Sequence, residues 1–204
     1  MKQFAKRAIA VFTMIVLAAG VSFALSACGG ASNDEKLIKD GISEVLDNFK
    51  NPTKESLSEY VGGNEAALAS LEAYGVDYVE LFQHLFKHFD YTIDDVKVNG
   101  DTAVVKLTVE NVNLEKALSE ASTAMQSDPE FVSEVQAAYV SGGEQAMYKL
   151  VFQKMYDAID SSTDIVKNQM ELTCTKTNGQ WAPDDESVTE LVSKVYGGLD
   201  MSSL

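Results

Sequence analysis

The chain has 204 residues, with 31 acidic side chains against 16 basic ones and a formal net charge of −15 at pH 7. This charge argues against a nucleic-acid partner, because binding to phosphates requires a basic surface. The length suits one folded domain, and an acidic surface by itself indicates solubility rather than a particular ligand.

The first 28 residues have the organisation of an export signal. Three basic residues lie within the first seven, an uncharged run extends from Ala8 to Cys28, and the next charge is Asp34. The run is long enough to span a membrane. However, small residues close it and no basic cluster follows, which favours a cleaved leader. The alternative is a retained signal anchor that contains an incidental cysteine.

The end of this run, Leu25-Ser26-Ala27-Cys28, resembles the lipobox of bacterial lipoproteins: an aliphatic residue, two small residues and a cysteine. The resemblance implies that the Cys28 thiol receives a diacylglyceryl group and that cleavage makes Cys28 the N-terminus. Acyl chains such as palmitate would then anchor the protein in the cell membrane, with its domain on the extracytoplasmic side. Cleavage removes three basic and no acidic residues, which changes the net charge from −15 to −18.

We therefore expect three regions: a lipoprotein signal peptide over 1–27, the lipidated cysteine with a polar tether over 28–34, and a single α+β domain over 35–200. The domain begins with an apolar stripe at helical spacing between residues 38 and 49. Asn51 and Pro52 predict the start of a second helix, as N-cap and first helical residue, which ends at Gly62-Gly63. Asn64 can cap a short third helix that stops near Gly75.

Residues 77–89, DYVELFQHLFKHF, carry the strongest helical pattern in the chain. On its polar face Glu80, His84 and His88 follow at four-residue steps, a spacing at which two histidines and a glutamate could share a metal. Lys87 beside the pair, and the absence of any other histidine from the sequence, favour a solvated face instead. We expect no metal site here and no cofactor. The wide apolar face consists of Tyr78, Leu81, Phe82, Leu85, Phe86 and Phe89.

The period then changes to that of β-strands, and residues 91–112 predict a hairpin with its turn at Asn99-Gly100. Apolar residues at 91 and 93 have the opposite parity to those at 96 and 98. A β-bulge at Asp94-Asp95 would return all four to one face, so we expect one there. On the return strand, alternation places Ala103, Val105, Leu107 and Val109 on one side.

Three helical segments follow between residues 113 and 163, with caps expected at Asn113 and Asp128 and a break at Gly142-Gly143. Residues 165–183 predict a second hairpin that turns at Asn178-Gly179 and contains Trp181, which we expect to close one end of the core. Asp184, Asp185 and Glu186 then suit the start of a final helix.

Cys174 is the second cysteine of the chain, and it alternates with apolar residues in the segment MELTCTK. This pattern predicts a small buried hydrophobic residue. A nucleophilic role would require a nearby histidine, and both histidines lie far away in the sequence.

The expected fold is α+β, with an antiparallel sheet of two hairpins, about 91–112 and 165–183, packed against several helices. The segments VKVNGDTAVVKLTVENV and TKTNGQWAPDD resemble strand and turn patterns of small bacterial lipoproteins with a nuclear-transport-factor-2-like, cystatin-like cone. The resemblance covers residues 34–200, and the helical segment 113–163 is longer than a minimal cone needs. These lipoproteins belong to families of unknown function, so the resemblance implies no catalytic residues.

Two classes of function are open. The first is a non-enzymatic envelope lipoprotein that binds a small molecule, a peptide or a neighbouring protein, or acts as a scaffold; its ligand-binding residues are unknown. The second is a small hydrolase or lyase that uses an acid–base pair in a cone-shaped pocket. The histidines are expected on a polar helix face, and GxSxG and SxxK motifs are absent from the sequence, so the first class is favoured.

Overall fold

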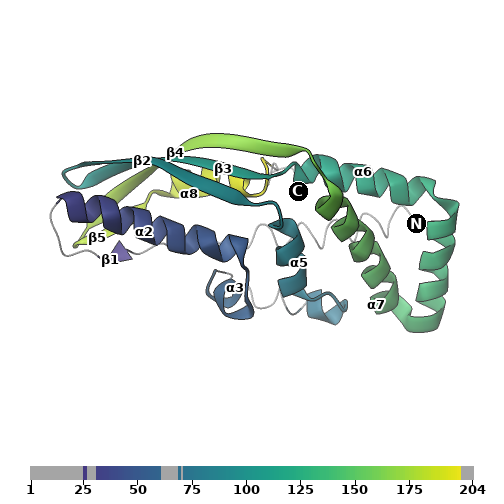
Figure 1. Ribbon diagram of the computed structural model, residues 1–204. Helices are drawn as coiled ribbons and strands as arrows, with labels where there is room; N and C mark the ends of the chain where they lie inside the picture. Colours follow the sequence, from purple (N-terminus) through teal and green to yellow (C-terminus); the bar gives the residue numbers. More distant parts are fainter. Residues whose placement is uncertain (1–24, 27–30, 61–68, 70, 199–204) are drawn as a thin grey trace.

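The computed structural model describes residues 25–26, 31–60, 69 and 71–198, and it confirms the α+β class (Figure 1). A single antiparallel sheet has the strand order β1-β5-β4-β3-β2. The strands are β1 Leu25–Ser26, β2 Asp90–Asn99, β3 Thr102–Val112, β4 Ile165–Thr177 and β5 Gln180–Pro183. The helices are α2 Ala31–Lys50, α3 Lys54–Tyr60, α5 Tyr78–Leu85, α6 Leu114–Ser127, α7 Pro129–Ser161 and α8 Asp185–Val195.

The two predicted hairpins are present, and β3 pairs with β4 along its whole length to join them. The predicted bulge is also present: the register of β2 and β3 shifts between Ile93 and Asp95, so that no residue of β3 lies opposite Asp94. The first turn differs slightly from the prediction. Asn99 pairs with Thr102, so the two-residue loop is Gly100-Asp101, with positive φ at the glycine alone.

Helices cover one face of the sheet. The side chains of Ala103, Val105, Leu107 and Val109 are buried as predicted, whereas the alternating residues such as Val104 face solvent. Figure 1 shows α2 and α8 on the covered side, α2 beside β2 and α8 beneath β3 and β4. This arrangement, one packed face and one wet face, is common for antiparallel sheets.

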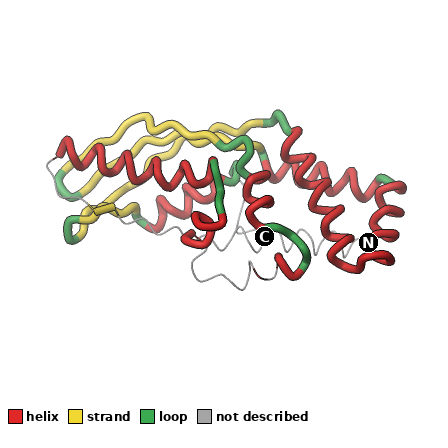
Figure 2. The backbone as a smooth tube through the Cα atoms, turned by 60° about the horizontal axis from the view of Figure 1, so that its bottom comes forward, coloured by secondary structure: helices red, strands yellow, loops and turns green. Residues whose placement is uncertain are grey.

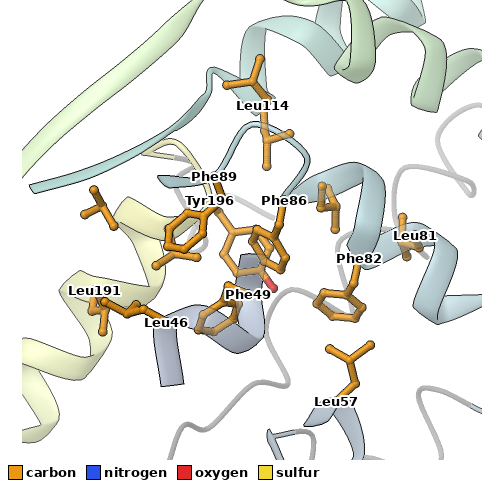
Figure 3. Packing of buried hydrophobic residues seen from close by; sticks show 14 of the residues in the cluster. Leu46, Phe49, Leu57, Leu81, Phe82, Phe86, Phe89, Leu114, Leu191 and Tyr196 are labelled. Carbon is orange, nitrogen blue, oxygen red and sulfur yellow. The ribbon is translucent and has the colours of Figure 1, made fainter. Parts of the chain in front are cut away.

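An aromatic cluster joins the sheet-covering helices to α5 (Figure 3). The ring of Phe86 lies 5.1 Å from Phe49 of α2 and 5.1 Å from Tyr196 at the end of α8. Beside it, Asn111 is fully buried and donates hydrogen bonds to the carbonyl groups of Leu85 and Val195, at 3.1 and 2.8 Å. One amide side chain thus ties β3 to the ends of α5 and α8, because it satisfies carbonyls at both helix ends.

The predicted caps at Asn113 and Asp128 are confirmed, since both side chains accept hydrogen bonds from the first turns of α6 and α7. Gly143 breaks α7 with φ of 70° and ψ of −158°, at the predicted position. Figures 1 and 2 show α6 and the first part of α7 projecting beyond the sheet. We call residues 114–142 the arm.

Three local predictions are corrected. Residues 31–34, expected in the tether, already belong to α2. The helix after Pro52 begins at Lys54, because Thr53 caps it: Thr53 Oγ1 accepts from the Ser56 amide, and Ser56 Oγ accepts from the Thr53 amide. The helix expected over 77–89 ends at Leu85, with Phe86 as its C-cap. The glycines at 62–63 and the cap at Asn64 lie outside the described residues.

Candidate functional site

The histidines of α5 lie against α7 and form an ionisable cluster with it. Asp77 caps α5 by accepting hydrogen bonds from the amides of Val79 and Glu80, and the buried apolar face of the helix then sets its rotation. In this position His84 faces the last turns of α7, where Tyr156 and Asp160 lie four residues apart. The solvated face expected for both histidines is therefore wrong: each is half-buried.

Asp160 is the centre of this cluster. Its carboxylate lies 2.8 Å from Nδ1 of His84 and 2.6 Å from Nζ of Lys87, and its backbone carbonyl accepts from Nε2 of His88 at 3.2 Å. The His84 ring stacks on Tyr156 with 4.2 Å between the ring centroids. Burial alone would raise the pKa of Asp160, but the hydrogen bonds from Lys87 and His84 lower it overall. The carboxylate is thus held ionised between two donors.

One ring nitrogen of each histidine is engaged in a hydrogen bond to Asp160. His84 directs Nδ1 to a carboxylate that also binds Lys87, and His88 directs Nε2 to a backbone carbonyl. Within the described residues, no three histidine, cysteine or acidic side chains are grouped so that they could hold a metal ion. Glu80, the third ligand considered, lies one turn before His84 on α5.

A second polar cluster joins the first turn of α2 to the second hairpin. Nζ of Lys176 lies 2.9 and 3.1 Å from the two carboxylate oxygens of Asp34, whose side chain is 7% exposed. The same ammonium lies 5.5 Å above the ring of Trp181. The hydrogen bond from Lys176 lowers the pKa of Asp34, and Trp181 contributes in the same direction, although its indole nitrogen makes no hydrogen bond of normal geometry to any described residue. We call Asp34, Lys176 and Trp181 the clasp.

No sequence signal pointed to the clasp. Asp34 was expected in a tether, and 142 positions separate it from Lys176. The burial of Trp181 was predicted and is confirmed, since its side chain is fully buried. Cys174 is likewise buried, as predicted, and burial raises the pKa of its thiol to about 11.

A hollow of about 420 Å³ lies between α6 and the end of α7. Its lining includes four alanines and the ion pair of Lys116 and Asp164, 2.8 Å apart. Two further hollows, of about 410 and 300 Å³, lie beside the bulge of β2 and before α5. Neither His84 nor Asp160 lines any of these three hollows. The pair of His84 and Asp160 is therefore separate from these three hollows.

No helix among the described residues combines the length and the apolar character that a membrane crossing requires.

Comparison with known proteins yields a structural likeness. No family model and no curated protein matches the sequence. The crystal structure of YcdA, a candidate lipoprotein of Bacillus subtilis subsp. subtilis str. 168, is similar with a TM-score of 0.42 and 19% sequence identity. The match covers 78% of this chain and 54% of that one, so the chain spans about half the length of YcdA.

Proposed function

We propose that the protein is a lipid-anchored protein of the cell envelope, cleaved before Cys28 and acylated on that cysteine. Its folded part lies on the extracytoplasmic side and serves as a non-enzymatic binding or scaffolding module. One observation carries the proposal: residues 25–28, which resemble a lipobox, end two residues short of α2, the first helix of the fold, which begins at Ala31. Cleavage there leaves every described helix and the two hairpins intact.

Cleavage would also remove β1, which pairs only Leu25 and Ser26 with β5. The four remaining strands keep their register, and β5 becomes the edge. A short strand that contains a proline suits this position, because both features discourage pairing with another chain. β5 has four residues and ends in Pro183. The mature sheet is thus compatible with loss of the leader.

The binding role is supported by what the ionisable groups do. The Asp160 cluster connects α5 to α7, and the clasp connects α2 to β4, so both have a structural role. The arm meanwhile presents Tyr139 and Val140, 49% and 85% exposed, near the break at Gly143. Apolar side chains at the end of a projecting element are suited to contact with another molecule.

A small hydrolase or lyase is the second candidate, and the pair of His84 and Asp160 is the observation that favours it. A carboxylate 2.8 Å from Nδ1 is the geometry that orients a histidine base. His84→Gln distinguishes the candidates, because glutamine keeps a hydrogen bond but transfers no proton near neutral pH. Incubation of wild type and variant with an envelope metabolite extract, followed by mass spectrometry, should show no turnover that depends on His84. Such turnover would favour the enzyme.

The anchor is tested by metabolic labelling with an alkyne analogue of palmitate. Wild type should incorporate the label and lose residues 1–27, whereas Cys28→Ala should stay unlabelled and retain its leader. Cys174→Ala is the matched control, because it removes the other cysteine, which is buried in the fold. Recovery of a labelled, membrane-bound Cys28→Ala protein would refute acylation at this residue.

A further inference from the structure

We infer that the anchor holds the domain in one orientation, with one end of the sheet against lipid head groups and the arm directed away from the bilayer. This inference rests on the proposed acylation of Cys28. The membrane-facing end, here called the anchor end, consists of residues 34–40 of α2, 97–102 around the first hairpin turn and 175–180 around the second.

The connection between lipid and fold is short. Cys28 precedes the first residue of α2 by three positions, and three residues span at most about 10 Å. A tether of six residues was expected, which would have let the domain turn freely above the membrane. With only two residues between the cysteine and the helix, the start of α2 must stay close to the head groups.

The clasp fixes the start of α2 to the sheet. Asp34 lies in the first turn of α2, and its ion pair with Lys176 fixes that turn to the end of β4. The two side chains are 7% and 18% exposed, so the pair is shielded from competing water and salt far more than a surface ion pair. The first turn of α2 therefore cannot swing away from the sheet, and holding this turn near the bilayer also holds the end of β4 there.

The arm lies at the opposite end of the molecule. In Figures 1 and 2, which share a horizontal axis, the start of α2 and the hairpin turns lie on one side and the arm on the other. β4 has 13 residues and α6 has 14, which places the tip of the arm on the order of 60 Å from the anchor end.

Charge favours the same orientation. The anchor end carries four lysines and four carboxylates, whereas residues 114–142 of the arm carry one lysine and five carboxylates. In the opposite orientation, the excess carboxylates of the arm would lie within the Debye length over which the potential of an anionic bilayer acts, and they would be repelled. The anchor end has equal numbers of lysines and carboxylates, so it is repelled less.

Energy transfer to the membrane tests the orientation. A donor dye is placed on Thr177→Cys at the anchor end or on Val140→Cys at the tip, both exposed, whereas Cys174 is buried. The lipidated proteins are reconstituted in phosphatidylethanolamine–phosphatidylglycerol vesicles that contain an acceptor-labelled lipid. Transfer from position 177 should exceed transfer from position 140 severalfold. Equal transfer would overturn the inference.

Two controls separate the causes. The mass of the Cys28 peptide reports acylation, so equal transfer with an acylated cysteine refutes the orientation alone, and an unmodified cysteine refutes both proposals. Lys176→Gln should reduce the ratio of the two transfers, whereas Lys106→Gln, which breaks an exposed pair with Glu171 in mid-sheet, should preserve it. An unchanged ratio in folded Lys176→Gln protein would overturn the role of the clasp.

Discussion

Asp34 and Lys176, 142 positions apart in the sequence, form an ion pair that is almost completely shielded from solvent. Exposed pairs such as Lys106 with Glu171, 51% and 61% exposed, are solvated whether or not they are paired. Loss of one partner of a shielded pair instead leaves the other charge poorly solvated and unpaired, and this lowers the free energy of unfolding. The pair should therefore matter for stability in a way that depends on pH.

Asp34→Asn should lower the midpoint of urea unfolding at pH 7, and its deficit should shrink in acid. The hydrogen bond from Lys176 lowers the pKa of folded Asp34 below that of the unfolded chain, which is near 4. The contribution of the ionised carboxylate is thus complete above about pH 4 and is lost as pH falls through the lower, folded-state pKa. Unfolding midpoints between pH 7 and pH 2.5 measure this loss. A deficit that stays constant over this range would contradict the assignment.

Cys174 should react slowly with thiol reagents in the native protein. Its side chain is fully buried, and burial raises the pKa of the thiol to about 11, so little thiolate is present at pH 8. Labelling should follow opening of the fold, with a rate that increases steeply in urea. Stopped-flow measurement with an aromatic disulfide reagent tests this, and a native rate equal to that of the unfolded chain would show that the cysteine is accessible.

His84 and His88 should not retain zinc. Nδ1 of His84 faces Asp160, His88 donates to the Asp160 carbonyl, and the Lys87 ammonium on the same carboxylate repels a cation. Dialysed protein should contain far less than one zinc per chain, measured by atomic emission. Stoichiometric zinc that disappears in His88→Ala would show that the cluster rearranges to bind metal.

Local patterns predicted the elements of this fold well. The bulge in β2, the caps at Asn113 and Asp128 and the break at Gly143 all depend on residues close together in the sequence. The sequence did not predict the cap at Thr53, because Asn51-Pro52 is an equally good local signal for a helix start. In the structure, the reciprocal hydrogen bonds between Thr53 and Ser56 set the start of the helix after Thr53.

Contacts between distant residues were not predictable in the same way. Periodicity placed His84 on a polar face, which is correct for an isolated α5 but omits the packing of α7 against that face. Asn111 shows the same limit, because a buried amide that serves two helix ends leaves no signature in its own strand. The candidate site depends on such pairs, so its geometry came from the structure.

Trp181→Ala should destabilise the protein by about 3–5 kcal/mol, the usual cost of removing a large buried aromatic side chain. The ring is fully buried on β5 and lies under the Lys176 ammonium. Native wild type should therefore emit at short wavelength, and circular dichroism should follow the unfolding of the variant in urea. Red-shifted native emission together with unchanged stability would place the ring on a binding surface instead.

Gly197 and Gly198, which follow the C-cap of α8 at Tyr196, should differ sharply in their tolerance of alanine. Both have positive φ, 68° and 81°, so each substitution carries the same backbone strain of about 1–2 kcal/mol. A Cβ at Gly197 would lie 2.1 Å from the carbonyl oxygen of Val112, whereas a Cβ at Gly198 meets no described atom within 4 Å.

The clash at Gly197 cannot be relieved by a side-chain rotation, because the obstructing atom belongs to the backbone at the end of β3. Separating β3 from α8 would also strain the bond from Asn111 to the Val195 carbonyl, now 2.8 Å long. Gly197→Ala should therefore cost more than about 4 kcal/mol, in the range reserved for severe core disruption. Gly198→Ala is the matched control, and it should lower the free energy of unfolding only by the backbone strain of about 1–2 kcal/mol. Equal urea midpoints for the two variants would show that the end of α8 yields freely and that the close approach to Val112 contributes little.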